Sequence, residues 1–452
     1  MSNINVIDAP CGMGKTSWAI QEINAHEDES YIFCTPFLGE ITRIRQSCGL
    51  FSRFKEPLPY TGTKIDDFNN LLSTGVDIAV THTTFLNATP ETLEAIRTGD
   101  YTLIIDEVLD VITDFNTVQT VAETPRQKVS KDDLKMLIEN HLIEIGSDYK
   151  VTWCGNEYGA DCKFSEVERF AKLNRLYCVD GRLLLTVFPP EMFSCFKQVY
   201  ILTYMFQSSM FKYYFDLFGI EYTLLNVAKQ GDKYYLQPYS ATYDVEFRYR
   251  CKELISICDN PKMNQYRTNA LSKSWYENSR TDDRLHELRN NLAHYFTRYL
   301  KGASASNGDI MWTTYSDYEQ SLKGKGYTRT RNLTEQERRC SPEAKKMIEQ
   351  ELSCFVPCNS RATNIYRNRW ALGYCVNMHF NPMLRRFFTD NNQSRIEKGL
   401  EPILPNDDLY ALSCLLQWLF RSRIRSGQPI SIYIPSRRMR QLLIDWLDGK
   451  NQ

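Results

Sequence analysis

The opening stretch of the chain limits its fold more than any other, because an apolar run there leads into a glycine-containing turn and then a helix-like segment. The apolar run ends at Asp8, the turn spans residues 9–14, and the next segment begins at Lys15, in the sequence NVIDAPCGMGKTSWA. Strand, glycine loop and helix in this order are what a phosphate-binding loop requires. An ordinary turn between a strand and a helix is the alternative.

The residue types in this loop suit a phosphate group. Glycines allow positive φ, so that backbone N–H groups can face phosphate oxygens. Lys15 can reach the β- and γ-phosphates and the Thr16 hydroxyl can hold Mg²⁺, while the N-terminus of the helix adds partial positive charge. We expect the ATP-binding residues to be Gly12, Met13, Gly14, Lys15, Thr16 and Ser17.

Four further apolar runs are predicted as buried strands, at residues 31–34, 77–80, 101–105 and 199–202. Polar residues follow each run, and helix-like segments such as 37–46 separate them. This alternation favours a parallel α/β sheet. The polar tips would lie at the carboxyl ends of the strands, where open α/β sheets bind ligands.

The third of these runs leads into Asp106-Glu107. A strand that ends in Asp-Glu is common by itself, but here it follows a phosphate loop in the order that a nucleotide site requires. We expect Asp106 to hold Mg²⁺ through water and Glu107 to activate the attacking water as general base.

Length and composition indicate a folded protein of more than one domain. A chain of 452 residues with 42% hydrophobic and 13% aromatic residues exceeds one typical domain and can bury full cores. No apolar run reaches the ~20 residues that span a bilayer, and no signal segment precedes the first strand. The 14 cysteines form no CxxC pair and are interpreted as free thiols. We expect a soluble intracellular protein.

The net charge of −1 hides an uneven distribution of arginine. Residues 421–440 contain six arginines and residues 361–386 five, without any acid, and Lys323, Lys325, Arg329 and Arg331 form a third cluster. Aromatic residues lie among them: Tyr366, Trp370, Tyr374, Phe380 and Tyr433. A solvated face is the simpler interpretation, but the pattern favours a track for a polyanion.

The motifs together resemble those of superfamily 2 DNA helicases, in a compact form similar to helicases proposed for bacteriophages. In the first half, Lys15 and Thr16 match motif I and Asp106-Glu107 match motif II. Thr35-Pro36 and Thr83-Thr84 resemble the motifs that contact the nucleic-acid backbone, and Thr203-Tyr204 resembles motif III, which couples hydrolysis to motion.

In the second half, the resemblance extends to three further motifs. Thr313-Thr314 is similar to motif IV, Arg361-Ala362-Thr363-Asn364 to motif V, and Gln417 with Arg421 and Arg423 to motif VI. On a helix, residues four apart share a face, so Arg421 is expected beside Gln417 as the arginine that acts on the γ-phosphate. Arg423 is the alternative if the helix ends early, and Arg425 is expected on DNA.

Two departures from the family pattern bear on the site. Ala9 stands where the strict phosphate-loop pattern has glycine, and the glutamine motif that reads adenine has no room before Asn5. The resemblance therefore leaves open whether ATP is preferred over other nucleoside triphosphates.

The resemblance implies two RecA-like α/β lobes, at residues 1–226 and 227–452, with ATP in the cleft between them. An insertion is expected at about 112–188, with a helix over 131–146.

The implied activity is ATP- and Mg²⁺-dependent movement on single-stranded or forked DNA. The nucleic-acid contacts are expected from Thr35, Pro36, Thr83, Thr84, Thr313, Arg361, Thr363, Asn364 and Arg425. Replication or recombination proteins are the expected partners, in the cytoplasm of a phage host. The alternatives are an RNA helicase and a non-unwinding nucleic-acid-stimulated ATPase, such as a packaging motor or loader.

Overall fold

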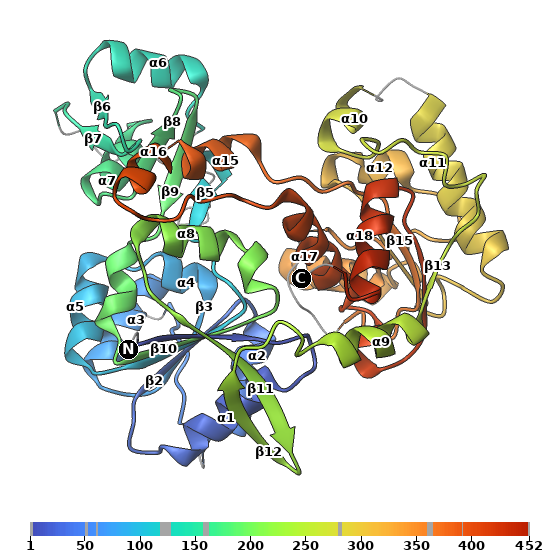
Figure 1. Cartoon of the computed structure of the whole chain (residues 1–452), viewed down its shortest axis with the longest axis horizontal. Coiled ribbons are helices and arrows are strands. Elements are labelled where there is room, and N and C mark those ends of the chain that lie inside the picture. The colour runs from blue at the N-terminus through green and yellow to red at the C-terminus, as the bar shows by residue number, and fades with distance from the viewer. Residues whose placement is uncertain are drawn as a thin grey trace. The chain divides into compact units, whose positions relative to one another are not determined.

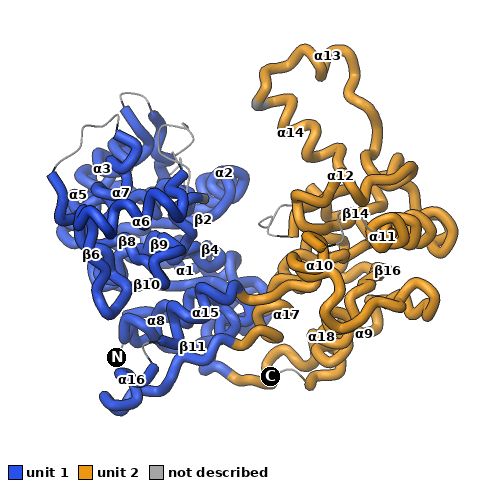
Figure 2. Tube along the Cα trace, turned by 90° about the horizontal axis from the view of Figure 1, so that it is seen from above, with its two compact units in different colours: residues 1–9, 13–239, 381–405 blue, residues 10–12, 240–380, 406–452 orange. Residues whose placement is uncertain are grey.

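The computed structural model describes residues 3–49, 53–59, 62–117, 128–156, 162–278, 283–358, 365–390 and 392–450. The chain forms two compact units, coloured separately in Figure 2. Unit 1 comprises Met1–Ala9, Met13–Tyr239 and Asn381–Pro405, and unit 2 comprises Pro10–Gly12, Ser240–Phe380 and Asn406–Gln452. Residues 227–239 and 381–405, which the sequence-based division assigns to the second lobe, thus group with unit 1. Within the described ranges, no helix is both long and apolar enough to cross a membrane.

Unit 1 is organised around a seven-stranded sheet in the order β12-β11-β1-β10-β4-β2-β3. All neighbouring strands are parallel except β11 and β12, which form an antiparallel hairpin. The bounds are β1 (Ile4–Asp8), β2 (Tyr31–Thr35), β3 (Ile78–Thr81), β4 (Thr102–Asp106), β10 (Gln198–Thr203), β11 (Thr223–Gln230) and β12 (Lys233–Pro238). The predicted parallel α/β sheet is therefore confirmed.

Helices cover both faces of this sheet (Figure 1). The chain runs from β1 toward β2 in one direction along the sheet and from β10 toward β11 in the other. Right-handed crossovers in opposite directions place their helices on opposite faces, here α1 (Lys15–Ala25) and α8 (Met210–Phe218). The remaining helices of the main layer are α2 (Leu38–Ser47), α3 (Lys64–Ser73), α4 (His82–Leu86) and α5 (Pro90–Thr98).

The expected insertion forms a small α+β subdomain with its own hydrophobic core, built around residues such as Phe115, Leu137 and Phe170. Its elements are β5 (Ile112–Asp114), α6 (Lys131–Glu139), β6 (Ile143–Ile145), β7 (Val151–Trp153), α7 (Ser165–Lys172), β8 (Leu176–Val179) and β9 (Leu183–Val187). The helix predicted over 131–146 is too long, because α6 stops at Glu139 and residues 143–145 pair with β7. His141, with a positive φ of 52°, turns the chain between them.

A segment from the second half of the chain packs on this subdomain in unit 1. It contains α15 (Pro382–Thr389) and α16 (Asn392–Glu397), which lie beside the subdomain in Figure 1. Phe387 meets the Tyr177 ring edge-on at 5.6 Å between centroids, Arg386 forms an ion pair with Asp180, and the Tyr149 hydroxyl donates to Asp390. These contacts explain why residues 381–405 group with unit 1.

Unit 2 contains a four-stranded sheet, all parallel, in the order β13-β16-β15-β14. Its strands are β13 (Ile255–Ile257), β14 (Ile310–Thr313), β15 (Ala371–Tyr374) and β16 (Ile430–Tyr433). Its helices are α9 (Val245–Leu254), α10 (Lys273–Asn278), α11 (Asp283–His294), α12 (Glu319–Leu322), α13 (Glu335–Arg338), α14 (Pro342–Leu352), α17 (Asp407–Leu419) and α18 (Arg437–Leu447). Each unit is thus a parallel sheet flanked by helices, consistent with the expected RecA-like lobes.

The aromatic residues between the arginines of unit 2 belong mainly to its core. Tyr366, Tyr374, Phe380 and Tyr433 are buried, and Trp370 is half-buried. These four buried rings therefore stabilise the fold and are not open stacking surfaces for a nucleic acid.

Candidate functional site

The loop after β1 has the backbone that its sequence predicts. Gly12 and Gly14 have positive φ angles of 84° and 96°, a conformation that glycine adopts without steric cost. Gly14 is the residue before the first turn of α1, and its carbonyl accepts from the Trp18 N–H at 2.8 Å. That first turn carries no acidic side chain, so nothing in it offsets the partial positive charge of the helix N-terminus.

The side chains expected at phosphate and metal lie at this helix start. Lys15, Thr16 and Ser17 are the first three residues of α1, and all three are half-buried, as is Met13. The Lys15 ammonium donates to the carbonyl of Ala9, the first residue of the loop. The hydrogen bond thus keeps the lysine ammonium at the loop where it is expected to bind phosphate.

Asp106 lies at the carboxyl end of β4, two strands from β1 in the sheet. Desolvation, together with the neighbouring Glu107 and Glu40 carboxylates, raises the pKa of its carboxyl to about 7, while Lys15 and Arg43 act in the opposite direction. A nearby cation favours the ionised form of such a carboxyl and lowers its pKa. The effect of Lys15 on Asp106 shows that the two side chains are close enough for their charges to interact.

Glu107 has an unusual backbone conformation. Its φ is +65°, in the left-handed region, and its N–H donates to the Leu202 carbonyl at 2.9 Å. A non-glycine residue in such a region costs on the order of 1–3 kcal/mol and persists where the surroundings fix it, most often at functional sites. The outlier therefore falls on the residue that the sequence nominates as general base.

Sequence reasoning missed several residues that hold this edge together. The Asp8 carboxylate accepts from the N–H groups of Met205 and Phe206 at 2.8 and 2.9 Å. The Asn226 side chain donates to the Asp8 carbonyl at 2.6 Å, and His82 Nε2 lies 3.0 Å from the Asp106 carbonyl oxygen. Asp8 is the polar residue at the carboxyl end of the first strand. The expectation that polar residues at strand ends contribute to the site could therefore have identified it as well.

The nucleic-acid candidates of unit 1 differ in exposure. Thr83 is exposed on α4 and Pro36 is half-buried after β2. Thr35 and Thr84 are buried, and the Thr84 hydroxyl lies 3.0 Å from that of Thr81 in the cap of α4. Thr83 and Pro36 are consequently the more accessible pair.

In unit 2, the end of α17 departs from the expected geometry. The helix stops at Leu419, and the Ser422 hydroxyl donates to the Leu419 carbonyl at 2.7 Å. The inference that Gln417 and Arg421 share one helical face is therefore wrong, because Arg421 lies in the turn beyond the helix. Gln417 is exposed and Arg421 is 5% exposed.

Arg423 and Arg425 follow in a short 3-10 turn. The Arg423 guanidinium lies 5.5 Å from the centre of the Trp370 ring, and its Nε donates to the Pro429 carbonyl at 2.6 Å. Arg425 is exposed. Thr313 is buried at the end of β14, and the motif V candidates Arg361, Thr363 and Asn364 lie outside the described residues.

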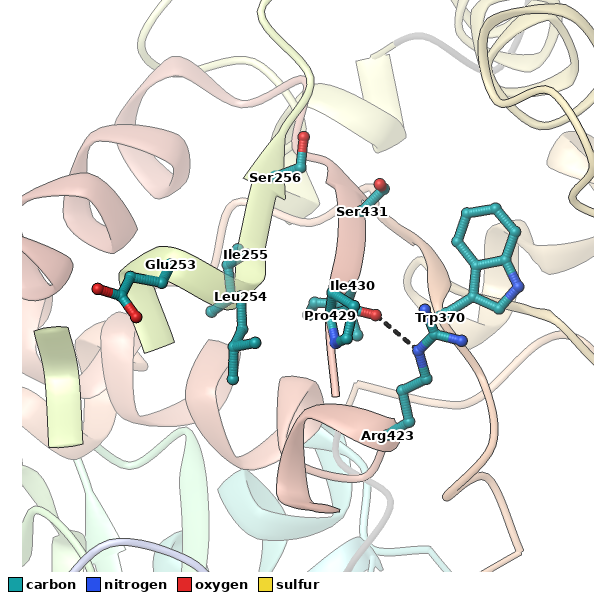
Figure 3. Close-up of a pocket in the computed structure, with 9 residues that line it drawn as sticks. All are labelled: Glu253, Leu254, Ile255, Ser256, Trp370, Arg423, Pro429, Ile430 and Ser431. Atoms are coloured by element: carbon teal, nitrogen blue, oxygen red, sulfur yellow. Dashed lines mark hydrogen bonds between the residues drawn. The ribbon is translucent and has the colours of Figure 1, made fainter. Parts of the chain in front are cut away.

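A cavity of about 260 Å³ in unit 2 lies beside Arg423 (Figure 3). Ile255 and Ile430, which line it, are the first residues of β13 and β16. It therefore opens at the amino ends of the strands, opposite the edge where parallel sheets bind ligands. Figure 3 shows the Arg423 side chain between the Trp370 ring and Pro429.

Other arginines of the predicted basic track are used inside unit 2. Arg369 is 4% exposed and donates to the Ile310 carbonyl at 3.0 Å. Arg438 pairs with Asp407 and Asp408, each at 2.7 Å. These two arginines therefore stabilise the fold.

The cysteines and other metal-ligating residues form no additional site in the described parts of the chain. All fourteen cysteines are free. Among the described ranges, no group of three or more His, Cys, Asp and Glu side chains could hold a metal ion.

Comparison with known proteins finds a relative along the full length of the chain. The SPbeta prophage-derived protein YonV of Bacillus subtilis (strain 168) is 35% identical over 465 residues, covering 100% of both chains. Family models match at residues 249–447, described as the YonV C-terminal Rossmann-like domain, and at residues 125–186, described as the YonV middle domain. The prophage origin of that relative agrees with the expected likeness to bacteriophage proteins.

Solved structures give more distant matches. An apo structure of XPD is 12% identical, with 98% of this chain and 95% of that chain covered and a TM-score of 0.49. Xpd4 of S. tokodaii is 13% identical, with 98% and 94% covered and a TM-score of 0.47. Neither match identifies a substrate or an activity for this chain.

Proposed function

The chain belongs to the YonV family, and we propose that it is an ATP-dependent helicase or translocase that couples ATP hydrolysis to movement along single-stranded DNA. The observation that carries the proposal is the arrangement at one edge of the unit 1 sheet. Lys15 is bonded to the Ala9 carbonyl of the glycine loop, its charge acts on Asp106 at the end of β4, and the adjacent Glu107 has a left-handed backbone. An ordinary turn between a strand and a helix would require neither the Lys15 contact to the glycine loop nor the left-handed backbone of Glu107 after β4.

The residues present fit ATP and Mg²⁺. The positive φ angles of Gly12 and Gly14 suit a loop whose N–H groups surround phosphate oxygens. Thr16 and Asp106 supply the hard oxygen donors that Mg²⁺ prefers. When bound, Mg²⁺ would neutralise charge that develops on the phosphates.

The chain's own groups then divide the work of hydrolysis. Lys15 would bind the β- and γ-phosphates, and Glu107 would orient the attacking water and accept its proton. Gln417, Arg421 and Arg423 remain the candidates for contacts to the γ-phosphate. A role in phage DNA replication or recombination, in the host cytoplasm, is part of the same proposal.

DNA contacts are proposed for exposed or partly exposed groups. Thr83 and Pro36 in unit 1 and Arg425 in unit 2 fit contacts to the sugar-phosphate backbone, which give grip without sequence preference. The family resemblance also assigns such contacts to Arg361, Thr363 and Asn364, and to Thr35, Thr84 and Thr313, whose side chains are buried.

The test is ATP hydrolysis by the full chain, measured in parallel without nucleic acid and with single-stranded DNA, duplex DNA and RNA. We expect single-stranded DNA to stimulate turnover most. Lys15→Ala, which loses a phosphate contact, and Glu107→Gln, whose amide cannot act as base, should lose it. A complete absence of hydrolysis under all conditions would overturn the proposal.

Strand displacement on a forked duplex separates the alternatives. Unwinding of forked DNA supports the helicase, and stimulation by DNA without unwinding favours a packaging motor or loader. Stimulation by RNA alone favours an RNA helicase.

A further inference from the structure

The hairpin β11–β12 brings an aromatic residue to Gly14, at the end of the phosphate loop that belongs to unit 1. β11 pairs with β1, and β12 forms the edge of the sheet beside α1. Figure 1 shows the hairpin next to α1. Lys229 and Tyr234 face each other in its register, and Gly231, at φ +60°, turns the chain between the strands.

Two hydrogen bonds from one side chain fix the hairpin on α1. Gln21 Oε1 accepts from the Tyr234 N–H at 2.8 Å, and Gln21 Nε2 donates to the Asp232 carbonyl at 2.9 Å. Because both ends of the amide are used, the backbone of Tyr234 has a defined position relative to the helix that begins at Lys15.

The Tyr234 ring lies directly against Gly14. A Cβ added at Gly14 would come 2.0 Å from Cε1, 2.5 Å from Cδ1 and 2.9 Å from Cζ of the ring. Gly14 therefore meets two demands, a positive φ and room for an aromatic neighbour. The ring is half-buried, and the Lys229 ammonium lies 5.3 Å from its centre.

This placement constrains what the ring can do for a bound nucleotide. Phosphates held by the loop accept hydrogen bonds from the N–H groups at the start of α1. The nucleoside, which is joined to the α-phosphate, therefore lies near this same end of the helix. The hairpin packs along α1 and brings an aromatic ring and a cation to that place. Aromatic rings stack on nucleobases with about 1–3 kcal/mol per base and little sequence preference.

We propose that Tyr234 is a nucleobase platform of the nucleotide site and that the site takes purine nucleoside triphosphates with little discrimination between adenine and guanine. This proposal rests on the proposed ATPase function and specifies its substrate class. Purines are favoured because their larger ring systems stack more strongly than pyrimidines, whereas stacking alone does not read the groups that distinguish adenine from guanine.

The test compares ligands with and without a base on the same protein. Isothermal titration of the full chain with ATP, GTP, CTP and inorganic tripolyphosphate gives four dissociation constants for each variant. Tyr234→Ala should weaken ATP and GTP binding about 5- to 150-fold, as expected from the loss of one stacking contact. The same variant should leave tripolyphosphate binding within about twofold.

Two matched variants separate stacking from packing. Tyr234→Phe keeps the aromatic face and should bind ATP like the parent. Tyr234→Leu keeps apolar contact with Gly14 but removes that face, so it should lose ATP affinity as Tyr234→Ala does, and it serves in its place if the alanine variant does not fold.

The outcomes also distinguish the two proposals from each other. Equal losses for ATP and tripolyphosphate would mean that the ring only supports the loop, which overturns the platform and leaves nucleotide binding intact. Lys15→Ala should weaken all four ligands. A parent protein that binds none of them would overturn the proposed function itself.

Discussion

The carboxylate of Asp8 accepts a hydrogen bond from the backbone N–H of Met205 at 2.8 Å. Asp8 ends the strand before the phosphate loop, and Met205 follows β10, the strand between β1 and β4. Phe206 donates to the same carboxylate, and Met205 has a positive φ of 59°. The Asp8 side chain thus joins the strand end before the proposed phosphate loop to the tight turn at Met205, which follows the segment that resembles motif III.

Asp8→Ala should destabilise the protein, because it leaves the buried Phe206 N–H and the partly buried Met205 N–H without their acceptor. A lost acceptor of this kind costs about 1–3 kcal/mol, which urea unfolding would measure. Asp8→Asn keeps one acceptor oxygen and should cost less. Equal stability of the alanine variant and the parent would mean that this turn is held by other contacts.

Glu107→Gly should make the protein more stable and inactive at once. Glycine adopts the φ of +65° without the cost that glutamate bears, so we expect a gain of about 1 kcal/mol together with loss of ATP hydrolysis. Glu107→Gln keeps the strain and loses the base, so it should lose activity without that gain. Thermal unfolding and ATP turnover of both variants check this.

Asn174→Gly is the matched control for that comparison. Asn174 also has a positive φ, of 57°, but lies in the subdomain formed by the insertion. Its substitution should leave turnover unchanged. If Glu107→Gly hydrolyses ATP at the parent rate, the water is activated by another group.

The pKa of Asp106, raised to about 7 by desolvation and by nearby carboxylates, predicts a pH dependence of stability. Between pH ~4 and 7 the folded protein holds a proton here that the unfolded chain does not bind. This contribution to stability is therefore present at low pH and is lost as the pH rises through about 7. Asp106→Asn should reduce the fall in melting temperature between pH 5.5 and 8.

Asp133→Asn is the control for the pH experiment. The Lys163 ammonium and the Ser130 cap hold the pKa of Asp133 down at about 2, so this carboxylate stays ionised throughout that range. Its contribution is lost only as the pH falls toward 2, and its substitution should leave the pH 5.5 to 8 difference unchanged. A parent-like difference in Asp106→Asn would contradict the raised pKa.

The features that sequence predicted well are those encoded by neighbouring residues. The loop needed only Gly12, Gly14 and Lys15 in order after an apolar strand, and Asp106 followed from four β-prone residues before it. Parallel pairing then brings such strand tips to one edge, so it could be expected without any knowledge of the packing that Lys15 and Asp106 lie at the same edge of the sheet.

Features that depend on distant residues could not be predicted in the same way. Arg369 and Arg438 were predicted to be part of an exposed track for a polyanion, because no acidic residue lies near them in the sequence. Arg438 instead finds Asp407, 31 residues away, and Arg369 finds the backbone of Ile310, 59 residues away. The early end of α17 and the return of residues 381–405 to unit 1 likewise follow from tertiary contacts.

Two arginines after α17, Arg421 and Arg423, should differ in what their substitution changes, the rate of hydrolysis or the stability of the fold. Arg421→Ala should lower kcat by at least ~10³ with little change in ATP affinity, the signature of a contact made in the transition state. Arg423→Ala should instead cost about 1–2 kcal/mol of stability, because it loses the Trp370 ring and the Pro429 carbonyl as partners. Single-turnover hydrolysis and urea unfolding distinguish them, and a kinetic loss confined to Arg423→Ala would reverse the assignment.

Arg425 offers the clearest test of DNA contact in unit 2, because its exposed side chain can be removed without opening the core. Arg425→Ala should weaken binding to single-stranded DNA and reduce the slope of log affinity against log salt by about 0.7, as expected when one phosphate contact to a single strand is lost. Because the side chain is exposed, the substitution should change the free energy of unfolding by no more than about 0.5 kcal/mol. Arg437, which is also exposed but begins α18, provides the control of equal charge. If Arg437→Ala changes the salt slope as much as Arg425→Ala, the effect reflects net charge alone and Arg425 has no specific place on the DNA.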